Sequence, residues 1–235
     1  MTGITPLSPA AHRGLRYNRH AAGGMRRFAR IGLSEIAVAA ADMPLCLAKD
    51  GQTGRFNLIA LMSLVEPANL FVFGGGFQAT YVPRAVMLGG FRLDARGRRG
   101  WPSIGRPQPG RCGWAAVRGE QPTPLAHDIA RALERLVADV EAAQALVDAW
   151  AAHGLIRPLG LSLAKADGGA HDLAGLYTID EAAVQALPDA DVIALHRADR
   201  LAPAAVLTGS LAQVERLRQL HNARFAPALT GYSLD

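Results

Sequence analysis

Cysteine and lysine are both scarce in this chain, and the cysteine pattern excludes two kinds of site. The 235 residues include two cysteines, Cys46 and Cys112, and neither belongs to a CxxC spacing. Zinc ribbons and dithiol redox sites need that spacing, so neither is predicted, and two lone cysteines fit a reducing compartment. The sequence leaves a disulfide between them open. Only Lys49 and Lys165 among the 25 basic residues are lysine, a bias that indicates a GC-rich genome before it indicates selection for anion contacts.

Long apolar segments are also missing. The longest apolar run, residues 36–48, contains Asp42 and Pro44 and is shorter than the ~20 residues that a membrane helix needs. The N-terminal region carries several arginines but no apolar segment after them, as a secretory signal would have. We therefore expect a soluble protein without a membrane span, in the cytoplasm.

The motifs of the common enzyme classes are absent from the sequence. It has no GxSxG nucleophile turn, no HExxH zinc motif, no Walker loop and no GxGxxG dinucleotide motif. Its seven histidines show no paired ligand spacing, so no metal site is predicted. We predict no catalytic residues and no cofactor. The sequence favours a non-enzymatic protein and leaves its ligand unknown.

The charge is divided between the two halves of the chain. The net charge is +5, but residues 1–120 carry an excess of ten basic groups and residues 121–235 an excess of five acidic groups. Halves of opposite sign can attract each other within the molecule, or the basic half can face an anionic partner. With half of its residues hydrophobic, the chain has the composition of an ordinary globular protein.

Signals for short strands dominate from Glu35 to about Arg118. Two turn sequences, Asp50-Gly51 and Thr53-Gly54, separate two of the expected strands, and the three glycines 74–76 predict a tight hairpin because glycine reaches positive φ without strain. The alternative for these glycines is an anion-binding nest. The strands are expected at residues 36–39, 45–48, 56–62, 70–73, around 80–82, and 88–93.

A helical period begins near residue 123. Thr123 is a good N-cap, Pro124 fits the first helical position, and Gly154 fits the residue after the helix end, so one long helix is predicted between them. A strand pair follows at 161–164 and 173–178, across a turn at 167–169. Three short helices are then expected: one capped by Asp180 and ending near Pro188, one running through His196, and one starting at Ser210.

These signals predict an α+β fold, in which a β-rich N-terminal half of short antiparallel strands packs against a helical C-terminal half with one long helix. Residues 1–33 are expected to form an irregular basic arm. Residues 34–235 are expected to form a single α+β domain, β-rich at 34–118, with a basic loop at 92–111 and helices at 123–222.

The basic loop is one candidate site. It combines arginine with glycine, proline and a nearby tryptophan, which suits anions such as nucleic acid, phospholipid head groups or acidic glycans. The alternative is a loop that is simply solvated. The candidate anion-binding residues are Arg96, Arg98, Arg99, Arg106 and Arg111.

A second candidate set would line a single pocket if the protein bound a small ligand. Its members have side chains that can donate or accept protons or hydrogen bonds, as a shared substrate would require. They are Glu66, Asn69, Tyr81, Arg84, Tyr177 and His196.

Several short motifs occur in one order along the chain. They are Ala41–Pro44, Ala68–Val72, Tyr81–Pro83, Gly154–Leu159, Gly175–Glu181 and Leu195–Arg197. In this order they resemble the bacterial SapC family over residues ~30 to ~222. Two segments depart from the family pattern: the triple glycine replaces an acidic turn, and the segment after Leu93 is rich in arginine instead of acidic and apolar.

The resemblance implies a function by association. The family is linked to surface-layer genes, and its members are often encoded near halogenase-like flavoproteins, cupin-like proteins and TonB-dependent receptors. A non-catalytic accessory or binding protein of surface-layer or envelope and nutrient-uptake systems is therefore predicted, with a protein partner or a second copy of itself, and with surface association. Two alternatives stay open: a helper or enzyme working with a flavin- or iron-dependent oxygenase or halogenase, and nucleic-acid or anion binding through the arginine-rich half.

Overall fold

The computed structural model describes residues 26–65, 68–74, 76–89, 91–92 and 124–235, together with short strands at 5–6, 16–17, 103–104, 114–115, 117–118 and 121–122. The chain forms two compact units. Unit 1 contains Met1–Gly24, Val72–Gln78 and Arg84–Ala138, and unit 2 contains Met25–Phe71, Ala79–Pro83 and Asp139–Asp235. Each unit is described by itself below.

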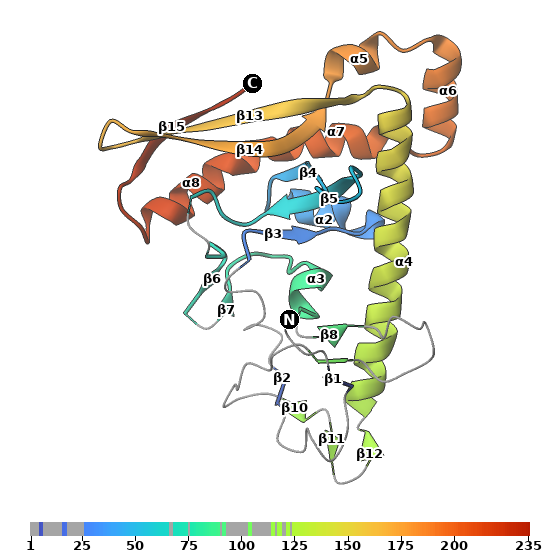
Figure 1. Cartoon of the computed structure of the whole chain (residues 1–235), viewed down its shortest axis with the longest axis vertical. Helices are drawn as coiled ribbons and strands as arrows, with labels where there is room; N and C mark the ends of the chain where they lie inside the picture. The colour runs from blue at the N-terminus through green and yellow to red at the C-terminus, as the bar shows by residue number, and fades with distance from the viewer. Residues whose placement is uncertain are drawn as a thin grey trace. The chain divides into compact units, whose positions relative to one another are not determined.

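Unit 2 is built on a six-stranded antiparallel sheet (Figure 1). The strand order is β15-β13-β14-β4-β5-β3, so three strands from the beginning of the chain pair with three from its end. The two groups meet where β14 pairs with β4 at Leu176↔Ala48 and Tyr177↔Leu47. The strands are β3 (Phe28–Arg30), β4 (Leu45–Lys49), β5 (Phe56–Leu61), β13 (Ile156–Lys165), β14 (Ala170–Ile179) and β15 (Leu229–Leu234).

The two faces of this sheet differ in composition. On β13 and β14 the leucines 159, 161, 163, 173 and 176 are buried, while the residues between them are small, polar and largely exposed. The buried face packs on helices: α7 (Leu201–Ser210) contacts β14 and β4, and α8 (Val214–Asn222) contacts β15. Figure 1 shows α7 and α8 running along the side of the sheet opposite the viewer. We call the leucine side the inner face and the other side the outer face.

Two hairpin turns in unit 2 follow the predicted turn chemistry. Between β4 and β5, the Asp50 carboxylate accepts hydrogen bonds from the backbone N–H groups of Gln52 and Thr53, and Gly54 adopts φ +69°. Between β13 and β14, Gly168 adopts φ +85°. Positive φ is strained for residues with a Cβ, so glycine defines where each strand pair reverses. Both predicted turns are confirmed.

The long helix α4 (Pro124–Ala152) confirms the predicted helix, and Gly154 follows its end with φ +68°. Thr123, its predicted N-cap, lies outside the described residues. Residues up to Ala138 belong to unit 1 and later ones to unit 2. In unit 2 the Trp150 indole N–H donates to the carbonyl oxygen of Arg200, which joins the helix end to the segment before α7.

Unit 1 has a small apolar cluster and short strands. Leu88 and Phe91 pack with Ala126, Ile129 and Leu133 of α4. The predicted hairpin is present: Val72 pairs with Phe77, Phe73 pairs with Gly76, and Gly74 adopts φ +60°. Gly75, the middle glycine, lies outside the described residues. The other elements are α3 (Arg84–Met87), β1 (Thr5–Pro6), β2 (Arg16–Tyr17), β6 (Val72–Phe73), β7 (Gly76–Phe77), β8 (Phe91–Arg92), β9 (Ser103–Ile104), β10 (Trp114–Ala115), β11 (Val117–Arg118) and β12 (Gln121–Pro122).

The predicted helices after β14 are present, with one addition. Asp180 accepts hydrogen bonds from the N–H groups of Ala182 and Ala183, which confirms it as the N-cap of α5 (Glu181–Gln185). Helix α6 (Asp189–Arg197) runs through His196, and η2 (Leu211–Gln213) with α8 follows Ser210. Helix α7, between them, was not predicted, and neither was strand β15.

The strand predicted at 36–39 is wrong, because these residues form helix α2 (Ile36–Ala40) after a 3-10 turn, η1 (Leu33–Glu35). Alanine favours helix, and the buried residues Ile36, Ala39 and Met43 recur at helical spacing. The strand predicted around 80–82 is also absent, since Tyr81 donates its backbone N–H to the Asp42 carboxylate instead of to a neighbouring strand.

The remaining strand predictions hold in part. Residues 45–48 and 56–62 match β4 and β5, whereas only Val72–Phe73 of 70–73 and Phe91–Arg92 of 88–93 are strand. The α+β class is confirmed, with strands in the N-terminal half and helices in the C-terminal half. The C-terminal half also supplies β13, β14 and β15 to the sheet.

Candidate functional site

A shallow hollow lies on the outer face of the unit 2 sheet. It has a volume of about 430 Å³ and is open to solvent. Strands β13 and β14 supply most of its lining, and the chain end beyond β15 supplies one residue. The lining residues are Pro158, Leu159, Gly160, Leu161, Ser162, Asp172, Leu173, Ala174, Gly175, Leu176, Tyr177 and Asp235.

An irregularity in strand pairing forms the floor of the hollow. Leu159 pairs with Leu176 and Leu161 with Leu173, so one residue of β13 faces two residues of β14 between these pairs. The extra residue makes a β-bulge, and Gly175 adopts φ +79° there. The three residues at the bulge are glycine, alanine and glycine, and a Cβ added at Gly175 would meet no atom within 4 Å. The floor is low because these side chains are small or absent.

The two ends of the hollow have different chemistry. At one end Pro158 pairs with Tyr177, and the Tyr177 ring meets the Phe56 ring edge-on at a centroid distance of 4.9 Å. At the other end Ser162 pairs with Asp172, and its hydroxyl donates to the Asp172 carboxylate at 2.6 Å. The hollow therefore offers an apolar aromatic surface at one end and hydrogen-bonding oxygens at the other.

A second surface feature of unit 2 is the helix pair α5–α6. None of the α5 side chains is buried, and Leu195 is the buried side chain of α6. The α6 residues Val192 and Ile193 are exposed although they are large and apolar. Figure 1 shows α5 and α6 lying beyond the end of β14, off the inner and outer faces of the sheet. Acidic residues occupy the first turn of each helix: Glu181, Asp189 and Asp191.

Among the residues of unit 2 that the structure describes, two carboxylates are buried, those of Glu35 and Asp42. Asp42 accepts hydrogen bonds from the Thr80 hydroxyl at 3.1 Å and the Tyr81 backbone N–H at 2.9 Å, and it forms an ion pair with Arg216 of α8. We call these four residues the Asp42 cluster. Burial alone would raise the pKa of Asp42, but the hydrogen bonds from Tyr81, Arg216 and Thr80 together lower it. Asp42 is therefore ionised at neutral pH.

Glu35 binds the same segment. One of its oxygens accepts the Tyr81 hydroxyl at 2.6 Å, and the other accepts the Gly32 backbone N–H at 2.9 Å, which caps the helical turn that begins there. The two buried carboxylates thus both bind Tyr81 of the segment Ala79–Pro83, and Asp42 also binds Thr80. This arrangement accounts for both acids as structural groups.

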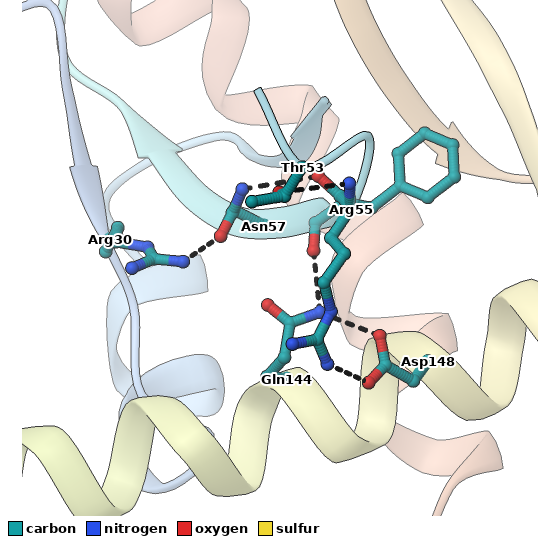
Figure 2. Close-up of polar contacts among 7 residues, drawn as sticks. Arg30, Thr53, Arg55, Asn57, Gln144 and Asp148 are labelled. Atoms are coloured by element: carbon teal, nitrogen blue, oxygen red, sulfur yellow. Dashed lines mark hydrogen bonds and ion pairs between the residues drawn. The ribbon is translucent and has the colours of Figure 1, made fainter. Parts of the chain in front are cut away.

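A polar network on the protein surface connects the β4–β5 hairpin with α4 (Figure 2). The Arg55 guanidinium lies 2.5 Å from the Asp148 carboxylate. The Gln144 amide donates to Asp148 at 2.8 Å and to the carbonyl oxygen of Phe56 at 2.9 Å. Arg30 of β3 donates to the side-chain oxygen of Asn57. We call this set the hairpin–helix network: Arg30, Arg55, Asn57, Gln144 and Asp148.

The structure gives different surroundings to the residues predicted to share a pocket. Tyr177 lines the hollow. Asn69 is buried, its side-chain oxygen accepts the Phe71 backbone N–H at 2.9 Å, and its amide lies 3.3 Å from the Met62 sulfur. The side chain of Tyr81 reaches Glu35.

The other members of that set lie elsewhere along the chain. His196 is exposed in the last turn of α6, as predicted, and Arg84 begins α3 in unit 1. Glu66 lies outside the described residues, as do the candidate anion-binding residues Arg96, Arg98, Arg99, Arg106 and Arg111. A common pocket for the set remains a prediction.

The sequence interpretation missed four residues that matter here: Glu35, Asp42, Ser162 and Asp172. The sequence did contain a signal for Asp42, which lies inside the longest apolar run. An acidic side chain at such a position must either be buried or interrupt the apolar segment. Ser162 and Asp172 carried no such signal. Their proximity depends on the register of β13 and β14.

Acidic, histidine and cysteine side chains are spread over the part of the chain that the structure describes. It contains no group of three or more His, Cys, Asp or Glu side chains placed to bind a metal ion. Cys46 is a free, buried cysteine, and burial raises the pKa of its thiol to about 12, so it stays protonated and unreactive. Among the described helices, none has the length and apolar character required to cross a membrane.

Comparison with known proteins gave a single kind of match. The model of the family SapC matches residues 7–217. No curated protein matches the chain. No solved structure matches it either.

Proposed function

The chain belongs to the SapC family, and we propose that it acts without catalysis, as an accessory protein that binds a protein partner in bacterial surface-layer or envelope and nutrient-uptake systems. The observation that carries this proposal is the α5–α6 helix pair. It exposes apolar side chains next to acidic ones on a well-formed part of unit 2.

The exposed apolar residues of α6 favour a partner over a purely solvated surface. Ile193 is 49% exposed and adjoins the exposed Val192, while the single buried residue Leu195 fixes the helix. Apolar side chains surrounded by polar ones are typical of the centre of a protein interface. The first turns of α5 and α6 are acidic, whereas the last turn of α6 carries Arg197, so we infer that the partner surface is apolar with a rim that carries charges of both signs.

The surroundings of the buried acids support a role without acid–base chemistry. A general base needs a lone pair directed at a substrate, in hydrogen-bond reach. Asp42 and Glu35 accept hydrogen bonds from Thr80, Tyr81 and Gly32. These contacts give both carboxylates a function in positioning the chain.

The surface-layer or uptake setting rests on the family. Subcellular fractionation of the native host tests the location. If the protein co-fractionates with the envelope, surface association is supported. A protein found wholly in the cytosol after gentle lysis would contradict this part of the proposal and leave the partner interaction to be tested separately.

The partner is tested by affinity capture from the native host, identification by mass spectrometry, and measurement with the purified partner. We expect Ile193→Glu to weaken that purified complex at least tenfold, because it places a charge in the apolar centre of the interface. The control is Val38→Glu on α2, which changes another exposed apolar residue of a unit 2 helix and should bind like wild type.

Three outcomes would contradict the proposal. One is the absence of any partner whose binding Ile193→Glu weakens. Another is an equal loss for Val38→Glu. The third is a bound flavin or iron in native mass spectrometry together with substrate turnover, which would favour the oxygenase-helper alternative.

A further inference from the structure

We propose that the outer-face hollow of β13 and β14 is a carbohydrate-binding site that takes neutral sugar units of an oligosaccharide. This site is separate from the α5–α6 surface and does not depend on a protein partner. It is inferred from the shape of the hollow, the charges around it and the chemistry of its two ends.

The shape suits an extended, flat ligand. The aromatic pair Pro158–Tyr177 and the polar pair Ser162–Asp172 lie four residues apart along β13, which is roughly 13 Å of strand. Between them the bulge leaves a low floor of glycine and alanine. A volume of about 430 Å³ falls within the range of small-molecule sites, although the hollow is open on one side. A chain of sugar rings can lie along such a floor with its outer edge in water.

The charges disfavour an anion in the hollow and a cation at its aromatic end. The lining includes the acids Asp172 and Asp235, and in the described part of the chain no arginine or lysine belongs to it, so phosphates and other anions would be repelled. At the aromatic end, the Lys49 ammonium lies 5.5 Å from the centre of the Phe56 ring, which itself contacts Tyr177. This positive charge disfavours a cation bound on the tyrosine. A neutral, polyhydroxylated ligand meets neither obstacle.

The two ends match the two kinds of surface that a sugar presents. The Ser162 hydroxyl donates its hydrogen to one Asp172 oxygen, so the serine oxygen and the second carboxylate oxygen can still accept hydrogen bonds from sugar hydroxyls. The C–H groups on one side of a sugar ring carry slight positive charge and pack against the electron-rich face of an aromatic ring. The half-buried Tyr177 lines the hollow, and the contact between its ring and that of Phe56 limits its movement before a ligand arrives.

The test is binding of maltotriose, chitotriose and mannotriose to the full chain, by saturation-transfer NMR and titration calorimetry. We expect at least one trisaccharide to bind, with saturation strongest on ring C–H protons. The proposal is overturned if none of the three binds, or if spermidine or inorganic phosphate binds at the hollow and displaces the sugar.

Variants locate the site. Ala174 and Ala164 are both exposed on the outer face, but only Ala174 lines the hollow. Ala174→Trp fills the hollow and should abolish trisaccharide binding, whereas Ala164→Trp, the same change on neighbouring β13, should leave it unchanged. Tyr177→Leu should weaken binding about tenfold by removing the stacking surface. Binding that survives Ala174→Trp would place the sugar elsewhere and overturn the assignment.

Discussion

Unit 2 contains the same pair of chemical groups, an aspartate and an arginine, in two different settings. In the Asp42 cluster, the side chain of Asp42 is 3% exposed and that of Arg216 is 35% exposed. In the hairpin–helix network, the side chains of Asp148 and Arg55 are 46% and 58% exposed. In both pairs the aspartate contacts the arginine, but only in the first pair is the carboxylate buried.

The difference shows why a count of ion pairs says little about stability. In a surface pair, the two side chains exchange contacts with water for contacts with each other, so the pair contributes little to stability. A buried carboxylate has lost its water and depends on every donor around it. Asp42 connects three parts of unit 2, namely the end of α2, the segment Ala79–Pro83 and α8. The following experiments test this contrast, beginning with the largest expected effect.

Removing the Asp42 charge should be the most costly change. Asp42→Asn keeps the side-chain shape but removes the negative charge that Arg216 contacts and weakens the bonds from Thr80 and Tyr81. We expect the free energy of unfolding to fall by about 2–4 kcal/mol. Urea unfolding followed by circular dichroism measures it. If Asp148→Asn, the matched change in the surface pair, were as costly, the contrast between the two settings would be wrong.

Lowering the pH should gradually reduce the contribution of Asp42 to stability. The pKa of Asp42 in the folded protein lies below its ordinary value of 3.8, so its stabilising contribution is present above that pH and is lost as pH falls through the lower folded value. The difference in unfolding free energy between wild type and Asp42→Asn should therefore shrink as the pH is lowered below about 3.8. Urea midpoints of both proteins across this range measure it. A constant difference would show that ionised Asp42 is not the stabilising species.

Tyr81→Phe should have an intermediate effect. It removes the hydroxyl that donates to the buried Glu35 carboxylate at 2.6 Å and leaves the ring and the backbone bond to Asp42 in place. We expect a loss of about 1–2 kcal/mol in the free energy of unfolding. Tyr232→Phe, which removes a hydroxyl from a half-buried residue of β15, is the control and should cost less.

Breaking the surface pair should matter least. Arg55→Ala and Asp148→Ala, with the double variant, form a thermodynamic cycle that isolates the interaction between the two side chains. We expect an interaction of about 0.5 kcal/mol or less that weakens further in high salt. A coupling above about 1 kcal/mol would mean that Gln144, which bonds to both Asp148 and β5, makes the network cooperative.

Local chemistry explains which elements could be predicted from the sequence. The capping residue Asp180, the glycines of the hairpin turns and the apolar period of α4 each act within a few residues, and all were identified. The apolar run at 36–48 misled the prediction because alternation and helical spacing are hard to distinguish in four residues. Helix α7 has apolar residues around its whole circumference and therefore shows no amphipathic pattern.

The candidate sites depend on contacts that no local pattern encodes. Asp42 meets Arg216 across most of the chain, and Ser162 meets Asp172 only because β13 and β14 pair in one register. The predicted pocket set included Tyr177 and Tyr81; in the structure Tyr177 lines the hollow and the Tyr81 hydroxyl donates to Glu35. No local pattern could show that their side chains have these different neighbours.

The pairing of β4 with β14 has a consequence for synthesis of the protein. Leu47 finds its partner Tyr177 more than half a chain length later, so a ribosome working at typical speed exposes β4 for roughly ten seconds before that partner emerges. During this interval the edge of β4, with Leu45, Cys46 and Leu47, has no neighbouring strand from β14. Such an edge attracts other nascent chains, and we therefore expect yield in a foreign host to depend on chaperones that bind extended apolar segments.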